Sequence, residues 1–199
     1  MDDKAHTTSR EFWDRGYAVI DDLLDASQVE FVSRAMDVSK GSGLIRDRGA
    51  KFITEAEDEY SPVLGELFLR ECRTRIEQAV GRELIQSYAY WRIYSKGAEL
   101  KPHVDRESSE LAVSITVRTD PDGHIWPINV DDLHGKEVNI PLKPGAGIVY
   151  LGHTVTHWRE PLDAETHKQL MLFYVLKEGD FSQHAYDGRE ADPLAGEEV

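Results

Sequence analysis

Cysteine and long apolar runs are nearly absent from the sequence. The 199 residues include one cysteine, Cys72, so no framework of internal disulfides is expected. The opening MDDKAHTTSR lacks the apolar segment of a signal peptide. No stretch approaches the roughly 20 apolar residues that a membrane-spanning helix needs. We therefore expect a cytoplasmic protein that does not interact with membranes.

Basic residues are also scarce. Lysine and arginine number 23 against 37 aspartates and glutamates, which gives a formal net charge of −14. Affinity for nucleic acids comes mainly from cations that neutralise phosphates, so this excess of acid predicts no nucleic-acid partner. We expect a small molecule or a peptide as the partner, and nothing in the sequence indicates the oligomeric state.

Helical periodicity and capping signals dominate the first part of the chain, residues 1–83. The elements predicted there are a short helix at 9–15, a strand at 16–20, a helix opened by a Ser27–Glu30 capping box and ended by Gly41 and Gly43, and a helix from 61–62 to Gly81. The polar, aperiodic segment 46–60 is predicted to be a loop and is a candidate lid.

From residue 84 onward the apolar period changes to two, which is typical of strands. Strands are predicted at 84–94, 111–117, 125–130, 137–142, 148–151 and 169–176. Many short strands after the helices indicate a mainly β, α+β fold, a sandwich or barrel with helices packed outside. We expect one domain over 1–186, with its β core at 84–178, and a flexible acidic tail at 187–199.

Three residues have the types and spacing of a metal site. His103 and Asp105 are two apart, so on an extended segment both side chains reach one ion. His157, after the Pro144–Gly147 turn and an apolar run, supplies a third ligand. Two histidines and one carboxylate form the facial triad of iron(II) oxygenases, which leaves positions open for an oxoacid and O2.

The stretch around these residues resembles the 2-oxoglutarate and iron(II)-dependent dioxygenases, in particular their prolyl-hydroxylase-like branch. The matching segments are YSKGAELKPHVD at 94–105, GAGIVYLG at 145–152, HWREP at 157–161, KQLMLFY at 168–174 and GYAVIDD at 16–22. The resemblance implies a double-stranded β-helix, or jelly roll, with supporting helices. It also implies iron(II), 2-oxoglutarate and O2 as cofactor and cosubstrates, with ascorbate as a reductant.

In that family, a basic residue on the strand after the distal histidine binds the far carboxylate of 2-oxoglutarate. Lys168 is the match, and alternation is expected to point Lys168, Leu170, Leu172 and Tyr174 into the barrel. Tyr94 is the predicted second donor. The alternatives are a lysine that merely flanks the strand and a barrel tyrosine with a satisfied hydroxyl. Arg159 lies too close to His157 in sequence to match the family position.

Substrate contacts are predicted from charged and aromatic residues near the ligands. Arg92, Arg106 and Arg159 are candidates to clamp an anionic group, and Trp126 is a candidate pocket wall. Each arginine is equally suited to a structural ion pair in so acidic a chain. The remaining histidines of the β core and the C-terminal part are expected in loops or on the surface, namely His124, His134, His167 and His184.

The resemblance implies oxidative decarboxylation of 2-oxoglutarate to succinate and CO2, coupled to oxidation of a substrate C–H bond. Asp105 favours hydroxylation, since related halogenases carry a small residue there. The substrate class expected is an amino acid, a peptide or another small metabolite. Alternatives are desaturation, cyclisation or N-dealkylation of a nucleobase at the same site, a cupin-like metal-binding or sugar-binding protein that does not use 2-oxoglutarate, and a non-catalytic binding module.

Overall fold

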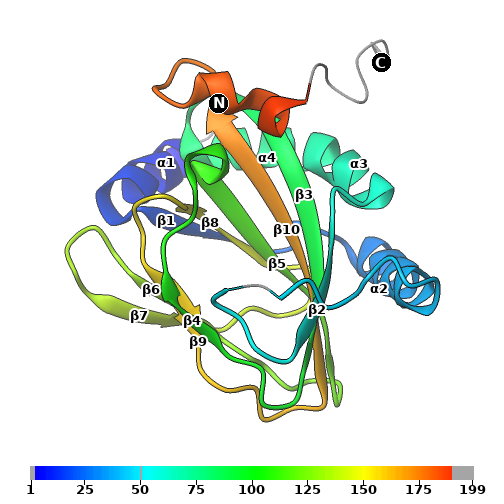
Figure 1. The fold of residues 1–199 in the computed structure, drawn as a ribbon. Helices are drawn as coiled ribbons and strands as arrows, with labels where there is room; N and C mark the ends of the chain where they lie inside the picture. Colours follow the sequence, from blue (N-terminus) through cyan, green and yellow to red (C-terminus); the bar gives the residue numbers. More distant parts are fainter. Residues whose placement is uncertain (1–2, 50, 190–199) are drawn as a thin grey trace.

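The computed structural model describes residues 3–49 and 51–189. Two antiparallel sheets face each other, and helices cover the outer side of the larger sheet (Figure 1). In chain order the elements are α1 (Asp3–Arg15), β1 (Tyr17–Ile20), α2 (Ala26–Gly41), β2 (Ala56–Tyr60), α3 (Val63–Glu71), α4 (Arg73–Val80), β3 (Leu84–Ser95), β4 (Leu100–His103), η1 (Glu107–Ser109), β5 (Leu111–Asp120), β6 (Ile128–Asp131), β7 (Glu137–Ile140), β8 (Gly147–Leu151), β9 (His157–Arg159), β10 (Thr166–Leu176) and η2 (Ser182–Gly188).

The strand order is that of a jelly roll. The larger sheet runs β1-β8-β5-β10-β3-β2, and the smaller sheet runs β4-β9-β6-β7. From β3 to β10 successive strands alternate between the two sheets, except that β6 and β7 both belong to the smaller sheet, so the chain winds around both sheets as in a double-stranded β-helix. The predicted mainly β, α+β fold with N-terminal supporting helices is confirmed.

The larger sheet is buried on both faces because helices cover one face and the smaller sheet the other. Residues 111–117 of β5 are buried without exception, and β10 is buried from His167 to Val175. Helix α2 packs on β5, and α3 packs on β3 and β10. No helix in the described part of the chain is long and apolar enough to cross a membrane.

Three predicted elements differ in detail from the structure. The helix expected from 61–62 to Gly81 is two helices, α3 and α4, which meet at Cys72. The capping box of α2 lies two residues earlier than predicted: Asp25 accepts from the backbone of Gln28, whose side chain accepts from the backbone N–H of Asp25. Asp25 and Ser27 are both good cap residues, so the sequence alone allows either to take the cap position.

The predicted loop 46–60 is a loop only in its first part. Residues 56–60 form β2, which pairs with β3 along the edge of the larger sheet. This strand was not predicted because its sequence, AEDEY, is acidic and lacks the β-branched residues that indicate strands. Of the predicted tail, 190–199 lies outside the described residues, whereas Asp187 and Arg189 are hydrogen bonded to the core.

Candidate metal centre and its pocket

Three side chains with metal-binding atoms meet at one end of the smaller sheet. His103 is the last residue of β4 and His157 the first of β9, and the two stand opposite each other in the antiparallel pair. Asp105 follows β4, where its backbone N–H donates to the carbonyl of Gly152 over 2.7 Å. One potential ligand atom from each of the three lies within 4.8 Å of the others. The sequence prediction that these residues converge is confirmed.

Each histidine is oriented by a hydrogen bond to the backbone carbonyl two residues before it. The Nδ1 of His103 bonds the carbonyl of Lys101 over 2.8 Å, and the Nδ1 of His157 bonds the carbonyl of Val155 over 3.1 Å. A carbonyl accepts only, so Nδ1 carries the proton and Nε2 keeps a free lone pair. Both Nε2 atoms face Asp105, at 3.7 and 3.8 Å from its Oδ1.

The charge states of these groups suit a divalent cation. Burial, opposed by the hydrogen bond to the Val155 carbonyl, lowers the pKa of His157 to about 4, so its ring is neutral at neutral pH. Burial and the nearby His157 lower the pKa of His103. Burial raises the pKa of Asp105 to about 6, although His103, Arg92 and Arg106 act to lower it. The Oδ2 of Asp105 is buried without a hydrogen-bond partner, as expected of a carboxylate whose missing partner is a metal ion. Two neutral imidazoles and one carboxylate are a donor set suited to iron(II).

Gly152 makes room for Asp105, and the sequence pattern did not single it out. A Cβ at this position would lie 2.2 Å from the carbonyl oxygen of Ser109 and 2.9 Å from Asp105 Oδ2. A side chain there would displace the carboxylate. The glycine directly follows the apolar run of β8 and could be noticed in the sequence. Why a glycine is needed there is explained only by its close contacts with Ser109 and Asp105 in the fold.

A pocket of about 470 Å³ opens from the three ligands into the space between the two sheets. Its walls are largely aromatic and come from both sheets. The lining residues include Tyr60, Tyr88, Tyr90, Tyr94, Tyr150 and Phe173. Three cations also line it, Lys51, Arg92 and Arg106. These six aromatic side chains all belong to the larger sheet, with the tyrosines on β2, β3 and β8 and Phe173 on β10.

Two guanidinium groups lie close to this pocket: Arg92 lines it, whereas Arg159 is not a lining residue but interacts electrostatically with Tyr94 and Tyr150, which are. Arg92 donates to the hydroxyl of Tyr94 over 3.3 Å and lies 3.5 Å from the carboxylate of Asp58, so it is paired. Arg159 is 0% exposed and has no acidic partner among the described residues. Its Nη1 donates to the carbonyl of Trp126, while Nε and Nη2 have no hydrogen-bond partner. Burial lowers the pKa of Arg159 to about 10 even though Tyr94 and Tyr150 act to raise it.

Trp126 and His167 pack around Arg159 and do not line the pocket. The guanidinium of Arg159 lies 4.7 Å from the centre of the Trp126 ring, which also contacts Tyr94 and His167 edge-on. The expectation that Trp126 forms a pocket wall is therefore wrong: the ring lies behind Tyr94. His167 was expected in a loop or on the surface, but it is fully buried on β10 and bonds Thr119 through Nδ1 at 2.9 Å.

Lys168 does not reach the pocket. Its ammonium donates to the carbonyl and hydroxyl of Ser33, each over 3.1 Å, and pairs with Asp37 over 2.6 Å, both on α2. The pocket-facing residues of β10 are Gln169, Met171 and Phe173. The predicted inward face was thus the wrong one, because β10 is apolar on both faces and its alternation carries no information about direction.

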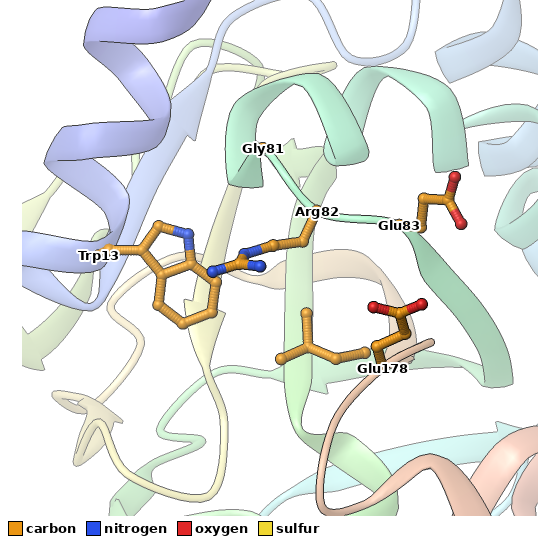
Figure 2. A pocket seen from close by; sticks show the side chains of 6 residues that line it. Trp13, Gly81, Arg82, Glu83 and Glu178 are labelled. Carbon is orange, nitrogen blue, oxygen red and sulfur yellow. The ribbon is translucent and has the colours of Figure 1, made fainter.

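A second cavity, of about 550 Å³, lies at the C-terminal end of β10, where Leu176 lines it (Figure 2). Trp13, Arg82 and Glu178 surround it, with the guanidinium of Arg82 placed 6.0 Å from the Trp13 ring. It contains no group of metal-binding side chains, since the only such group among the described residues is the set around Asp105.

No model of a known family matches the sequence, and no curated protein sequence matches it significantly. Solved structures with the same fold are nevertheless numerous. A prolyl-4-hydroxylase from Pseudomonas putida is 12% identical, with a TM-score of 0.68 over 85% of this chain and 97% of that one. A prolyl hydroxylase from Trichoplax adhaerens, in complex with a hypoxia inducible factor peptide, is 13% identical, with a TM-score of 0.70 over 87% and 90%.

The similar structures also include an enzyme with a different reaction. The epimerase SnoN, in complex with Fe3+, alpha ketoglutarate and nogalamycin RO, is 14% identical, with a TM-score of 0.69 over 86% of this chain and 83% of that one. At such identities the likeness establishes the fold, the double-stranded β-helix that these enzymes share.

Proposed function

We propose that this protein is a non-haem iron(II) oxygenase that uses 2-oxoglutarate and O2. The observation that carries the proposal is the convergence of His103, Asp105 and His157 with both Nε2 atoms and one carboxylate turned to a common point. Three ligands on one side of an ion leave coordination positions open on the other side, toward the pocket. The same fold holds iron and 2-oxoglutarate in the complex of SnoN.

Iron(II) bound to these three residues would supply the coupled oxidation of 2-oxoglutarate, to succinate and CO2, and of a substrate C–H bond. The residues of the chain have other tasks. The carbonyls of Lys101 and Val155 hold the imidazoles in the tautomer that binds a metal. The walls of the pocket would position the substrate and so fix which of its bonds faces the ligands.

Arg159 is our candidate for the anchor of the far carboxylate of 2-oxoglutarate, in place of Lys168. A fully buried guanidinium without a carboxylate is unfavourable by several kcal/mol, so it calls for an anion in the working state. Tyr94, between the two guanidiniums, accepts from Arg92 and keeps its own O–H proton to donate. Arg159 and Tyr94 would then hold the carboxylate through charge-assisted hydrogen bonds.

The reaction outcome that we propose is hydroxylation of an amino acid, a peptide or another small metabolite. It is supported by Asp105, since a carboxylate in that position leaves no room for a halide ligand. Two enzymes of similar structure catalyse other reactions: SnoN is an epimerase and SnoK a carbocyclase. The test therefore includes analysis of the product. Transfer of an atom from isotopically labelled O2 into the product would distinguish hydroxylation from desaturation, cyclisation and epimerisation.

The test is an anaerobic titration of the metal-free protein with iron(II), followed by 2-oxoglutarate. We expect a visible charge-transfer absorption when the oxoacid chelates the iron, and succinate release when O2 and ascorbate are added. His157→Gln should weaken iron binding by more than about tenfold. His153→Gln is the matched control, because this histidine lies four residues away and is not one of the three ligands.

An intact protein that binds iron at this site but shows no interaction with 2-oxoglutarate would refute the proposal. That result would favour a cupin-like metal protein on the same fold. Equal loss of iron binding in the His157 and His153 variants would show instead that the metal is held elsewhere.

A further inference from the structure

A short C-terminal segment lies beside the metal pocket and contacts two of the residues that line it. We call η2, residues 182–188, the strap. It follows β10 and lies against β3, β10 and η1, across the top of the molecule in Figure 1. The strap brings Asp187 into contact with two residues that line the metal pocket, Tyr60 from β2 and Arg106 from the loop after β4.

Asp187 is held as a ligand would be. Its Oδ2 accepts from the Tyr60 hydroxyl over 2.6 Å and from Nη2 of Arg106 over 2.8 Å. Its side chain is 11% exposed, whereas that of Arg106 is 56% exposed. A phenol and a guanidinium that meet at one carboxylate oxygen form a carboxylate-binding site, and in this structure a residue of the chain itself fills it.

The strap adopts an unfavourable backbone conformation in order to do so. Tyr186 and Asp187 both lie in the left-handed region, with φ of 56° and 54°. Two successive residues with side chains are rare there because the Cβ crowds the backbone. Backbone strain of this kind persists where surrounding contacts impose it, and it is relieved when the segment moves away.

The surface beside this carboxylate suits an apolar molecule. The guanidinium of Arg106 lies over the ring of Tyr88 at 4.6 Å, and Tyr88 stacks on Phe173 with ring centres 4.4 Å apart. Both rings line the metal pocket. Arg106 directly follows the ligand Asp105, so a molecule held by Arg106 would extend along these rings next to the metal ligands.

We propose that Tyr60 and Arg106 bind a carboxylate of the substrate, and that Asp187 of the strap occupies their site until the substrate displaces it. The substrate is then a small carboxylic acid with an apolar or aromatic body. This inference rests on the proposed function, because it takes the displaced partner to be the molecule that is oxidised. Asp187 is a positioning residue that competes with the substrate.

The experiment measures binding of phenylacetate and hexanoate, each compared with its primary amide. Calorimetry is done on the full chain loaded with iron(II) and saturating 2-oxoglutarate without O2, so that the cosubstrate site is filled. Asp187→Asn should tighten binding of the acids by roughly tenfold, since the competing carboxylate is gone and more of the protein is ready to bind. Binding of the amides should not change.

Two further variants separate the site from the stability of the strap. Glu107→Gln removes another strap contact, the 3.0 Å pair with His184, but leaves Asp187 on Arg106. It should not reproduce the gain in acid affinity. Arg106→Gln should abolish the preference for acids over amides, and thermal unfolding of each variant checks that it folds.

The inference fails if acids and amides bind alike to both the wild type and Asp187→Asn, or if Glu107→Gln gives the same gain. The charge-transfer absorption is recorded in the same samples. If acids bind more tightly than amides in an Arg106-dependent way but the absorption is missing, the carboxylate site is supported and the proposed function is refuted. If the absorption is present but acids and amides bind alike, the proposed function is supported and the carboxylate site is refuted.

Discussion

Among single residues, the buried guanidinium of Arg159 is the basis for proposing it, in place of Lys168, as the anchor of the cosubstrate. Lys168 satisfies its ammonium with Ser33 and Asp37 on the helical side of the sheet. Arg159 has two guanidinium nitrogens without a partner inside the barrel. The two residues carry the same charge, but only one of them needs an external anion, so their substitution should have opposite consequences.

We predict that Arg159→Gln weakens 2-oxoglutarate binding and that Lys168→Gln does not. Loss of one partner of a buried charge pair costs about 2 kcal/mol or more, which corresponds to roughly thirtyfold in affinity. The measurement is the dissociation constant of 2-oxoglutarate in the iron-loaded protein, with Arg159→Lys as a variant that keeps the charge. Weaker binding in Lys168→Gln, with Arg159→Gln unaffected, would restore the family-like assignment.

The three candidate metal ligands were predictable because they stand in an ordered set that is read directly from the chain: a Tyr-bearing strand, a Gly turn, His-x-Asp, a β region, a Pro/Gly turn, a strand and then His. Arg159 was not, because its significance comes from the absence of a partner, and partners are known only from the fold. Gly152 and Asp187 belong to the same category. Their roles depend on contacts with residues distant in sequence, Ser109 for one and Tyr60 for the other.

At the scale of elements, β10 carries two different surfaces on one strand. One surface lines the pocket through Gln169, Met171 and Phe173. The other contacts the helices, where the hydroxyl of Tyr174 donates to the carbonyl of Leu69 on α3 over 2.6 Å. A strand that is buried on both sides has no polar face, so its sequence predicts the strand well and its orientation poorly.

We predict that Tyr174→Phe destabilises the fold and leaves the site unchanged. The substitution leaves the buried carbonyl of Leu69 without a hydrogen-bond donor, which lowers the free energy of unfolding by about 1–3 kcal/mol. Urea unfolding measures that loss, and iron and 2-oxoglutarate titrations should match the wild type. A normal stability combined with altered 2-oxoglutarate affinity would mean that Tyr174 faces the pocket after all.

For the whole molecule, buried histidines couple stability to pH. Burial, followed by the nearby charges of Arg159 and His124, lowers the pKa of His167 well below the usual value of 6.5. His157 behaves likewise, with a pKa of about 4 in the metal-free protein. Below about pH 6.5 the unfolded chain binds protons at these rings and the folded chain does not, so acid favours unfolding. Asp105, with its pKa raised to about 6, acts in the opposite sense between its usual 3.8 and that value.

We predict that the metal-free protein loses stability from about pH 6.5 downward, and that His167→Asn reduces the slope. One histidine contributes up to about 1.4 kcal/mol per pH unit in that window. The measurement is urea unfolding at a series of pH values, with the exposed His134 changed to Gln as the control. A slope that His167→Asn leaves unaltered would show that this ring is protonated in the folded state.

The global fold was predictable because three signals agreed. The two-residue period of apolar residues and the turns between them indicated many short strands, and the resemblance to the 2-oxoglutarate and iron(II)-dependent dioxygenases implied a jelly roll with helices outside. The short strands were harder. β4 and β9 have four and three residues, too few for a periodic signal, yet they hold both histidine ligands. Their strand character is set by pairing with each other, which links residues more than fifty positions apart in the chain.

The loop before β2 and the strap, which lie beside the pocket, differ in the kind of hydrogen bonds that hold them in place. The loop before β2 is fixed by backbone hydrogen bonds at both ends: Arg46 and Asp58 exchange two, and the amide of Lys101 donates to the carbonyl of Phe52. Among the described residues, backbone–backbone hydrogen bonds join the strap only to residues next to it in sequence, Gly179, Phe181 and Arg189, and side chains attach it to the rest of the molecule. Side-chain contacts break one at a time, whereas a strand-like edge opens cooperatively. Ligands should therefore enter and leave on the side of the strap, residues 182–188. The loop before β2 should stay in place while the strap moves.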